Sequence, residues 1–329
     1  MIDSTPDSDA RVDSLRRRID DALIDCLSDR APDLMYDPIR YVLRGGGKRV
    51  RPLIVMLVSQ AYGAEDEDVL DVALAVEIFH NFTLVHDDIM DEATERRGRS
   101  SVHVKWDEGT AILAGDLMLA LSYELLTASE ALPARPLLAI YNRMVEQLCI
   151  GQRLDTHFET TADVSVEDYL EMIDGKTAAL LSACFELGAV AGGASDDHVA
   201  MLAEAGRQAG RAFQIQDDLL DVTADDENWG KAVGGDLKNG KRTYVTLKAF
   251  EAADGDEREW FSRLLDGGIS VDEVPEARRR MQALGVFDEA RSAVASYTED
   301  AFDRLSVLPD TAATHHLMWL LEKLQARSH

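Results

Sequence analysis

Apolar residues recur every three to four positions along almost the whole chain. Near the start, for example, Val12, Leu15 and Ile19 fall on one side of a helix. This spacing is typical of helices that bury one face. The sequence has no useful length of the alternation that marks strands, and glycine and proline fall between the helical segments. We therefore predict an all-α fold, a single large helical bundle. Its helices are expected at residues 12–27, 38–43, 52–62, 67–93, 110–129, 136–158, 166–173, 176–190, 197–222, 243–253, 257–265, 271–284, 287–305 and 311–326.

The domain organisation is predicted to be simple. The 329 residues contain no linker rich in proline, glycine or serine, and no internal repeat except a short acidic motif. Domain boundaries usually fall in such linkers. We therefore expect residues 12–329 to form a single domain, and residues 1–11, which are mostly polar, to be a disordered tail.

The composition is strongly acidic, with a net charge of −27 and only 8 Lys beside 26 Arg. Surfaces that bind nucleic acid or anionic membranes are basic, so both kinds of partner are excluded. An acidic shell suits a protein that works in very high salt, where repulsion between like charges is screened. We therefore expect a halophilic protein that loses structure in low salt. A melting temperature indifferent to KCl would contradict this hypothesis.

Cysteine usage and hydropathy indicate a cytoplasmic protein. Cys26, Cys149 and Cys184 are scattered, which fits neither a disulfide framework nor a zinc site. The first ten residues do not resemble a signal peptide. The longest apolar stretch, residues 177–194, contains Glu186 and several glycines. It is predicted to be a buried core helix rather than a membrane span.

Two copies of the pattern Asp-Asp-x-x-Asp stand 130 residues apart. On a helix, the first and last carboxylates of each copy lie on one face, so each copy offers a patch of oxygen ligands. Mg²⁺ prefers such ligands and usually bridges carboxylates to phosphate oxygens. Two such patches, facing each other across a bundle, would hold a polyphosphate. The positions are Asp87, Asp88, Asp91, Asp217, Asp218 and Asp221.

The alternative is that these aspartates are simply solvated. The chain has 61 acidic residues, so an Asp-Asp pair is common, and we expect the pairs at 196–197 and 225–226 to be solvated. The two motifs differ because apolar residues surround them, as Leu84-Val85 and Ile89-Met90 do for the first. Carboxylates among apolar neighbours are costly unless they are paired or bind metal. Two motifs of identical spacing therefore favour function.

Cations at glycine turns accompany both motifs. Lys48 and Arg51 follow three glycines, and Arg96 and Arg97 follow the first motif by five residues. Glycine lets the backbone approach a ligand closely, and Arg offers a fork that matches phosphate oxygens. The alternative for the first turn is a helix end followed by solvent-exposed cations. Lys176, Lys231, Lys238 and Lys241 lie near the second motif or at glycines, which is informative in a chain so poor in lysine.

The histidines are less informative. His86 adjoins Asp87 and could orient it, but a packed helix histidine is equally compatible with its position. Chemistry alone assigns no role to His80. The sequence therefore predicts a phosphate and metal site from its aspartates and cations rather than from its histidines.

Together these residues resemble the trans-isoprenyl diphosphate synthases, the head-to-tail family that contains farnesyl and geranylgeranyl diphosphate synthases. The resemblance spans residues 40–246, whereas residues after about 253 share little beyond helical character. One departure is Ser100-Ser101, where a proline is expected. The matching segments are Gly46-Gly47-Lys48-Arg49-x-Arg51-Pro52, Asp87–Asp91 with Arg96-Arg97-Gly98, Lys176-Thr177, Phe213-Gln214, Asp217–Asp221, Gly230-Lys231 and Gly234-Gly235-Asp236 to Lys241.

The resemblance implies a helical bundle around a deep central cavity, usually a homodimer. It implies three Mg²⁺ ions per active site, with Mn²⁺ as a substitute, held by the six aspartates. Its substrates are isopentenyl diphosphate and allylic diphosphates.

The resemblance also implies roles for individual residues. The catalytic residues it implies are Asp87, Asp88, Asp91, Lys176, Thr177, Gln214 and Asp217. The isopentenyl diphosphate contacts are Lys48, Arg51, His80 and Arg97. The allylic diphosphate contacts are Arg96, Lys176 and Lys241, with Lys231 near the metal ions. Thr177, Phe213 and Gln214 are expected to stabilise an allylic cation.

Product length is predicted from the helix that carries the first motif. Phe82 lies five residues before Asp87, about 7.5 Å along a helix that rises 1.5 Å per residue. Its ring is expected to form the floor of the pocket, with Thr83 as a small neighbour and Phe79 as a second stop. In the family, this combination resembles the archaeal geranylgeranyl type. We therefore predict a C20 product, with C15 and C25 as alternatives.

Three rival functions are weaker. A terpene cyclase would not need the second cationic site at Lys48 and Arg51. A non-catalytic subunit of a prenyl synthase would be expected to have a damaged motif, whereas both motifs are whole. An acidic Ca²⁺-binding or scaffold protein does not explain the ordered basic turns.

Overall fold

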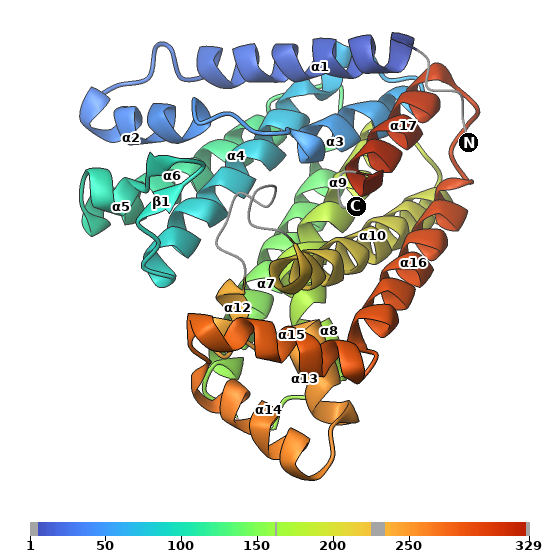
Figure 1. Cartoon of the computed structure of the whole chain (residues 1–329). Coiled ribbons are helices and arrows are strands. Elements are labelled where there is room, and N and C mark those ends of the chain that lie inside the picture. The colour runs from blue at the N-terminus through green and yellow to red at the C-terminus, as the bar shows by residue number, and fades with distance from the viewer. Residues whose placement is uncertain (1–5, 162, 225–233, 327–329) are drawn as a thin grey trace. The chain divides into compact units, whose positions relative to one another are not determined.

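The computed structural model describes residues 6–161, 163–224 and 234–326, and these are almost entirely helical (Figure 1). The all-α class is therefore confirmed. The elements are α1 (Pro6–Asp25), α2 (Asp33–Leu43), α3 (Val50–Ala61), α4 (Asp66–Met90), β1 (Glu95–Arg96), β2 (Arg99–Ser100), α5 (Val102–Lys105), α6 (Glu108–Leu126), α7 (Ala134–Phe158), α8 (Val166–Ile173), η1 (Asp174–Ala178), α9 (Ala179–Ala191), α10 (Asp196–Thr223), α12 (Gly235–Lys238), α13 (Tyr244–Ala252), α14 (Gly255–Gly267), η2 (Val271–Glu273), α15 (Val274–Ala283), α16 (Val286–Leu305) and α17 (Ala312–Ala326).

The chain divides into two compact units. Unit 1 consists of residues 1–141, 184–200 and 307–326, and unit 2 consists of residues 142–183, 201–306 and 327–329. The single domain expected from the sequence stays a prediction. Each unit is described by itself below.

In unit 1, α4 is the central helix. It packs against α6, α3 and α1, and residues along most of its length are buried. Most residues of α3 are buried as well, since its sequence is apolar on all sides. A helix buried by its neighbours needs no polar face. The burial of α4 fixes the place of its last turn, which carries the first aspartate motif.

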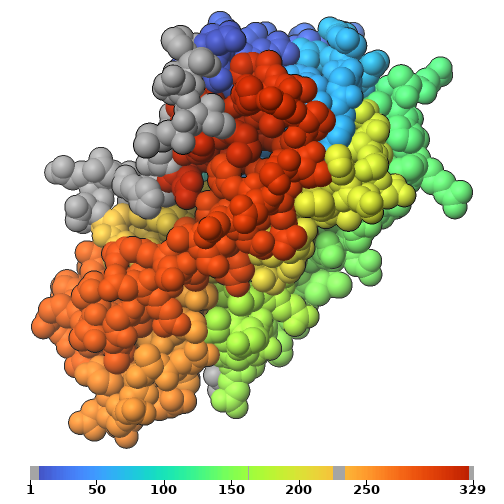
Figure 2. All heavy atoms as spheres, turned by 90° about the vertical axis from the view of Figure 1, so that its right-hand side faces the viewer, coloured from blue at the N-terminus to red at the C-terminus, as the bar shows by residue number. Residues whose placement is uncertain are grey.

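In unit 2, α8, α10, α13, α14, α15 and α16 share one hydrophobic core. Tyr169, Ile215, Leu247 and Phe261 are among its buried members. Figure 2 shows, in orange and orange-red, the outer surface that α14, α15 and α16 form. The core anchors the second half of α10, where Asp218 and Asp221 are also buried.

Most predicted helices agree closely with those observed, although α2 begins at Asp33 rather than at residue 38, and two further expectations need correction. The predicted tail at residues 1–11 is too long, because α1 begins at Pro6. Ser8 is buried against His316 of α17, and Asp9 pairs with Lys323, so tertiary contacts hold this segment in the helix. The second correction is a short hairpin, β1–β2, which no strand pattern predicted.

Candidate active site

The predicted site residues fall in both units, and each group is described within its own unit. In unit 1, Asp87 and Asp88 occupy the last turn of α4, and Asp91 caps its C-terminus. The Asp88 side chain is 6% exposed and accepts a 2.7 Å hydrogen bond from Arg96 Nε. Burial raises the pKa of Asp88, and the Arg96 guanidinium opposes that rise. Arg96 also lies 3.8 Å from Asp87 Oδ2, so it balances the charge of both carboxylates.

The hairpin that carries Arg96 turns at Arg97-Gly98. Both residues have positive φ, 54° and 69°, as the two central residues of a type I′ hairpin turn require. Arg96 pairs with Arg99 in the ladder. Arg97 donates a hydrogen bond to the Gly46 carbonyl. The hairpin therefore brings Arg96 to the first aspartate motif and Arg97 to the first glycine turn, and both are predicted diphosphate ligands.

The first glycine turn is anchored by a residue to which the sequence assigned no role. Arg49 has φ of 51°, is 2% exposed and makes ion pairs with Glu77 at 2.5 Å and Asp20 at 2.7 Å. Its Nη2 also donates to the Leu43 carbonyl. A buried charge is tolerated when it is paired and hydrogen-bonded. Arg49 therefore fixes the backbone beside the exposed Lys48.

Arg51 and His80 meet across α3 and α4. Arg51 Nη1 lies 3.3 Å from His80 Nε2. Burial, followed by the positive charges of Arg51 and Arg97, holds the pKa of His80 well below its usual range. A neutral imidazole can accept a hydrogen bond from Arg51. His80 is therefore suited to orient a guanidinium rather than to add another charge.

An aromatic layer lies below the first motif. The Phe82 ring is 4.8 Å from the His86 ring and 5.4 Å from Phe79, which in turn is 5.4 Å from Tyr141. Thr83 is half-buried and donates to the His80 carbonyl. The structure therefore groups the two phenylalanines that the sequence linked to product length.

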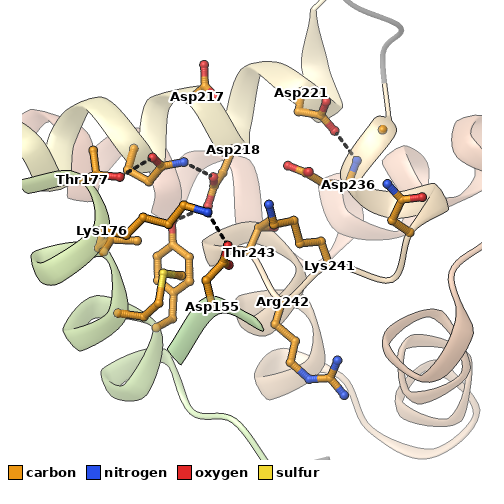
Figure 3. Close-up of a pocket in the computed structure, with 16 residues that line it drawn as sticks. Asp155, Lys176, Thr177, Asp217, Asp218, Asp221, Asp236, Lys241, Arg242 and Thr243 are labelled. Atoms are coloured by element: carbon orange, nitrogen blue, oxygen red, sulfur yellow. Dashed lines mark hydrogen bonds and ion pairs between the residues drawn. The ribbon is translucent and has the colours of Figure 1, made fainter. Parts of the chain in front are cut away.

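Unit 2 contains a pocket of about 380 Å³ around the second motif (Figure 3). It gathers five aspartates and two lysines in one place. Several predicted residues line it, whereas Phe213 is 59% exposed and is not one of the lining residues. Its lining consists of Asp155, Tyr169, Met172, Ile173, Lys176, Thr177, Gln214, Asp217, Asp218, Asp221, Gly235, Asp236, Asn239, Lys241, Arg242 and Thr243.

Asp218 is the most buried carboxylate of this pocket. It accepts hydrogen bonds from the Tyr169 hydroxyl at 2.5 Å, the Tyr244 N–H at 2.9 Å and Gln214 Nε2 at 3.1 Å. Burial is the main cause that raises its pKa to about 7, and these donors oppose the rise. In Figure 3, Asp217 points away from Asp218 on the other side of α10.

Lys176 and Thr177 come from η1, a π-helical turn between α8 and α9. The Lys176 ammonium pairs with Asp155 of α7. The Thr177 hydroxyl donates to Gln214 Oε1 at 2.9 Å. Thr177 is thus joined through Gln214 to Asp218 of the second motif, whereas Lys176 is paired with Asp155 (Figure 3).

The segment that begins at Gly234 contacts the second motif. Asp221 Oδ2 accepts a 3.1 Å hydrogen bond from the Asp236 N–H at the start of α12. Lys241 lines the same pocket, whereas the guanidinium of Arg242 points away from the carboxylates in Figure 3. Lys231 lies outside the described residues, so its predicted role near the metal ions stays a prediction.

The donor set fits Mg²⁺ that is shared with a substrate. Within the described part of the chain, no three Asp, Glu, His or Cys side chains converge closely enough to form a metal site by themselves. Asp217, Asp221 and Asp236 nevertheless line the pocket and offer carboxylate oxygens. Mg²⁺ is commonly bound by one or two carboxylates plus substrate phosphates. The pocket therefore has the ligand type that such an ion requires.

Comparison with known proteins decides the family. Residues 32–281 match the polyprenyl synthetase family. The chain is 38% identical to a geranylgeranyl diphosphate synthase of Methanosarcina mazei over 97% of this chain and 98% of the relative. This chain belongs to the polyprenyl synthetase family. The trans-isoprenyl diphosphate synthase class predicted from the sequence is thereby confirmed.

Other polyprenyl synthetases share its fold and differ in product. A geranylfarnesyl diphosphate synthase of Natronomonas pharaonis is 35% identical over 95% of this chain and 96% of its own. The crystal structure of a geranylgeranyl pyrophosphate synthetase from Pyrococcus horikoshii has a TM-score of 0.89, 34% identity and coverage of 96% and 97%. A polyprenyl synthase of Caulobacter crescentus, complexed with calcium and isoprenyl diphosphate, has a TM-score of 0.86 at 28% identity, with coverage of 99% and 98%.

The sequence missed several residues of this polyprenyl synthetase site. Asp155, Tyr169 and Asp236 line the pocket, and Glu77 anchors the first glycine turn. Asp155 and Glu77 each stand alone in a chain with 61 acidic residues. Only the Asp236 position, at a glycine turn, carried a recognisable signal.

Proposed function

We propose that this polyprenyl synthetase condenses isopentenyl diphosphate head-to-tail with C5 to C15 allylic diphosphates to give geranylgeranyl diphosphate, C20. The observation that carries this proposal is the pocket of unit 2, where Asp217, Asp218 and Asp221 stand with Lys176 and Lys241. Carboxylates and ammonium groups together suit a metal-bound diphosphate. Several relatives are named geranylgeranyl diphosphate synthases, which supports the C20 product.

Isopentenyl diphosphate is assigned to the cations of unit 1. Lys48 is exposed at the glycine turn, and Arg51 is oriented by the neutral His80. Arg97 is held by the Gly46 carbonyl. A guanidinium that is already oriented loses less side-chain entropy when it binds phosphate oxygens. These contacts position the double bond of the nucleophile.

The allylic diphosphate is assigned to Arg96, Lys176 and Lys241. We propose three Mg²⁺ ions, with Mn²⁺ as a substitute, on Asp87, Asp88, Asp91, Asp217, Asp218 and Asp221. When bound, Mg²⁺ neutralises charge on the departing diphosphate. The arginine and lysines add fixed positive charge where negative charge develops. The leaving group is thus stabilised and the C–O bond can ionise.

The chemistry that follows needs no nucleophilic side chain. The double bond of isopentenyl diphosphate attacks the allylic cation, and a proton is then lost to the departing diphosphate. The oxygens of Thr177 and Gln214, which are joined by a hydrogen bond, supply dipoles near the second motif. Fixed dipoles stabilise a developing cation without reorganisation of solvent. The exposed ring of Phe213 is a further candidate for this role.

Product length is assigned to the aromatic layer of unit 1. Phe82 rests on the fully buried Phe79, which packs against Tyr141. Such a stack resists displacement by a growing chain, because each ring is held by the next. The alternative products are C15 and C25, and one relative is named a geranylfarnesyl diphosphate synthase. Thr83, beside Phe82, leaves space that a second aromatic residue would fill.

We further propose a homodimer that works in the cytoplasm at high salt. Helix α6 is apolar, yet only 39% of its most apolar 18-residue stretch is buried, and Ile112 and Leu113 are exposed. Exposed apolar patches mark interaction sites. A second copy of the chain that covers α6 would remove this surface from water. The net charge of −27 supports the salt requirement.

The proposed function is tested by a single assay. Purified protein in high KCl with Mg²⁺ is incubated with labelled isopentenyl diphosphate and C5, C10 or C15 allylic primers, and the dephosphorylated products are sized. A C20 alcohol from all three primers is expected. C15 or C25 would overturn the product length while keeping the reaction. No condensation at any salt concentration would favour a non-catalytic subunit.

A further inference from the structure

Lys176 and Thr177 lie on an unusual backbone element. They belong to η1 (Asp174–Ala178), a single π-helical turn between two α-helices. Such turns are rare and frequently occur at functional sites. One extra residue in a turn changes the direction of every side chain in it. The geometry of η1 therefore sets where the ammonium and hydroxyl groups point.

Glycines allow helices to press on both sides of this turn. A Cβ on Gly151 of α7 would lie 2.2 Å from the Lys176 N, and one on Gly175 would lie 2.6 Å from the Gln147 carbonyl oxygen. On α10, a Cβ on Gly210 would lie 2.6 Å from the Ala178 Cα. The backbone of η1 thus contacts α7 and α10 directly, and this packing limits how far the turn can relax.

A charged clamp holds the first residue of the turn. Asp174 accepts hydrogen bonds from Arg211 Nε at 2.6 Å and Nη2 at 2.5 Å, and from Arg207 Nη1 at 3.0 Å. Both arginines come from α10 and lie one turn apart, and α10 also carries Gln214 and the second motif. Charge-assisted hydrogen bonds of this kind fix geometry as well as adding stability. Arg207 has a second carboxylate partner, Glu204, at 2.6 Å.

We infer that Asp174 is a positioning residue for the allylic diphosphate. The clamp from Arg207 and Arg211 holds η1 in its π form. In this form, η1 presents Lys176 to the pocket and Thr177 to Gln214. This inference rests on the proposed function, because it assigns Lys176 to the allylic substrate. Asp174 touches neither substrate nor reacting atoms in this scheme.

The decisive variant is Asp174→Asn, which keeps the shape of the side chain and removes its charge. Arg211 then loses the carboxylate of Asp174 and Arg207 keeps only its pair with Glu204, so the clamp no longer holds the turn and Lys176 shifts from its place. A displacement of about 1 Å costs on the order of 100-fold in rate. We expect kcat/KM for the allylic primer to fall about 10- to 100-fold, while the KM for isopentenyl diphosphate, which is bound by cations of unit 1, stays within twofold.

The chain offers matched controls. Glu204→Gln removes the other partner of Arg207 and leaves the Asp174 pairs in place, so both KM values are expected to stay within twofold. Asp174→Glu restores the charge and is expected to recover most of the allylic kcat/KM. Circular dichroism and the melting temperature in high KCl show whether each variant is folded. If Asp174→Asn does not fold, Arg211→Gln with Arg207 retained is measured in the same way.

The outcomes separate this inference from the proposed function. If the wild type condenses the substrates and Asp174→Asn matches Glu204→Gln, Asp174 has no positioning role. If both KM values rise together, Asp174 supports the fold in general, and the inference is overturned. A wild type without condensation activity contradicts the proposed function itself. A selective loss with the allylic primer, recovered by Asp174→Glu, supports the inference.

Discussion

The two Asp-Asp-x-x-Asp motifs have the same spacing and different partners. In unit 1, buried Asp88 receives its main hydrogen bond from the guanidinium of Arg96. In unit 2, buried Asp218 receives hydrogen bonds from neutral groups, which are the hydroxyl of Tyr169, the Tyr244 N–H and the amide of Gln214. Burial raises the pKa of both, and that of Asp218 reaches about 7. The buried carboxylate of the first motif is therefore paired with a cation, whereas the hydrogen bonds to Asp218 come from neutral groups.

We therefore expect Asp218 to depend more than Asp88 on cations from solution. A carboxylate stabilised by neutral donors alone remains costly to ionise in a buried place. The nearby Lys176 is paired with Asp155, so its charge is already partly balanced. We therefore expect Mg²⁺ to supply positive charge near Asp218, whereas Asp88 already has the guanidinium of Arg96.

The largest expected effect comes from removing a carboxylate of each motif. Asp217→Asn and Asp87→Asn are each expected to lower kcat by about 10²–10³-fold, the loss typical of a removed electrostatic contact in an active site. Because the second motif is expected to rely more on cations from solution, the Mg²⁺ concentration needed for half-maximal rate is expected to rise more in Asp217→Asn than in Asp87→Asn. Steady-state assays over a Mg²⁺ titration measure both quantities. Asp197→Asn, an exposed change on the same helix α10, is the control. Equal Mg²⁺ requirements in the two motif variants would break the comparison.

The next effect distinguishes the partners of the buried carboxylates. Arg96→Gln leaves Asp88 without its cation, and an unsatisfied buried polar group costs about 1–3 kcal/mol, or more when it is charged. Tyr169→Phe removes one of three donors to Asp218 and is expected to cost about 1 kcal/mol. Urea unfolding in high KCl measures both free energies of unfolding. Arg96→Lys keeps the charge and serves as the control. A larger loss in Tyr169→Phe than in Arg96→Gln would show that neutral donors matter more than the cation.

Most of the fold was predictable because its signals are local. Periodicity and glycine or proline breaks placed α8 at its observed bounds and the other long helices within a few residues. The start of α1 was missed because contacts with α17 decide it, and these are distant in sequence. The π turn at residues 174–178 was missed as well, since its cause is packing against α7 and α10 rather than a residue pattern.

The site was predictable where residue type and spacing repeat, as in the two motifs. Partners that come from other helices were not predictable. Asp155 and Glu77 carry a function only because folding brings them to Lys176 and Arg49. A lone acid in an acidic chain has no distinguishing neighbour in sequence. Chemistry also gave His80 no role, and its contact with Arg51 appears only in three dimensions.

A change in product length tests whether the aromatic layer of unit 1 limits the growing chain. Phe82→Ala removes the ring between Phe79 and His86 and is expected to shift the main product from C20 to C25, because the growing chain reaches one isoprene unit further. Phe213→Ala, an exposed aromatic change in unit 2, is the matched control and is expected to leave product length unchanged. Chromatography of the dephosphorylated products measures the shift. An unchanged C20 product from Phe82→Ala would remove Phe82 from the floor.

The smallest expected effect is a pH dependence of the free energy of unfolding that arises from His80. The pKa of His80 in the folded chain lies well below its usual range because of burial and the nearby Arg51 and Arg97. Its unfolded value is about 6.5. Between these two pKa values the unfolded chain binds more protons than the folded chain, so this site lowers stability as pH falls below about 6.5, by up to about 1.4 kcal/mol per pH unit.

The variant that tests this effect is His80→Gln, which stays neutral and keeps an acceptor for Arg51. The free energy of unfolding of the wild type, relative to His80→Gln, is therefore expected to be lower at pH 5.5 than at pH 7.5 in urea titrations at constant KCl. A difference that does not change with pH would mean that His80 is not held neutral, and that the cations of unit 1 are balanced in another way.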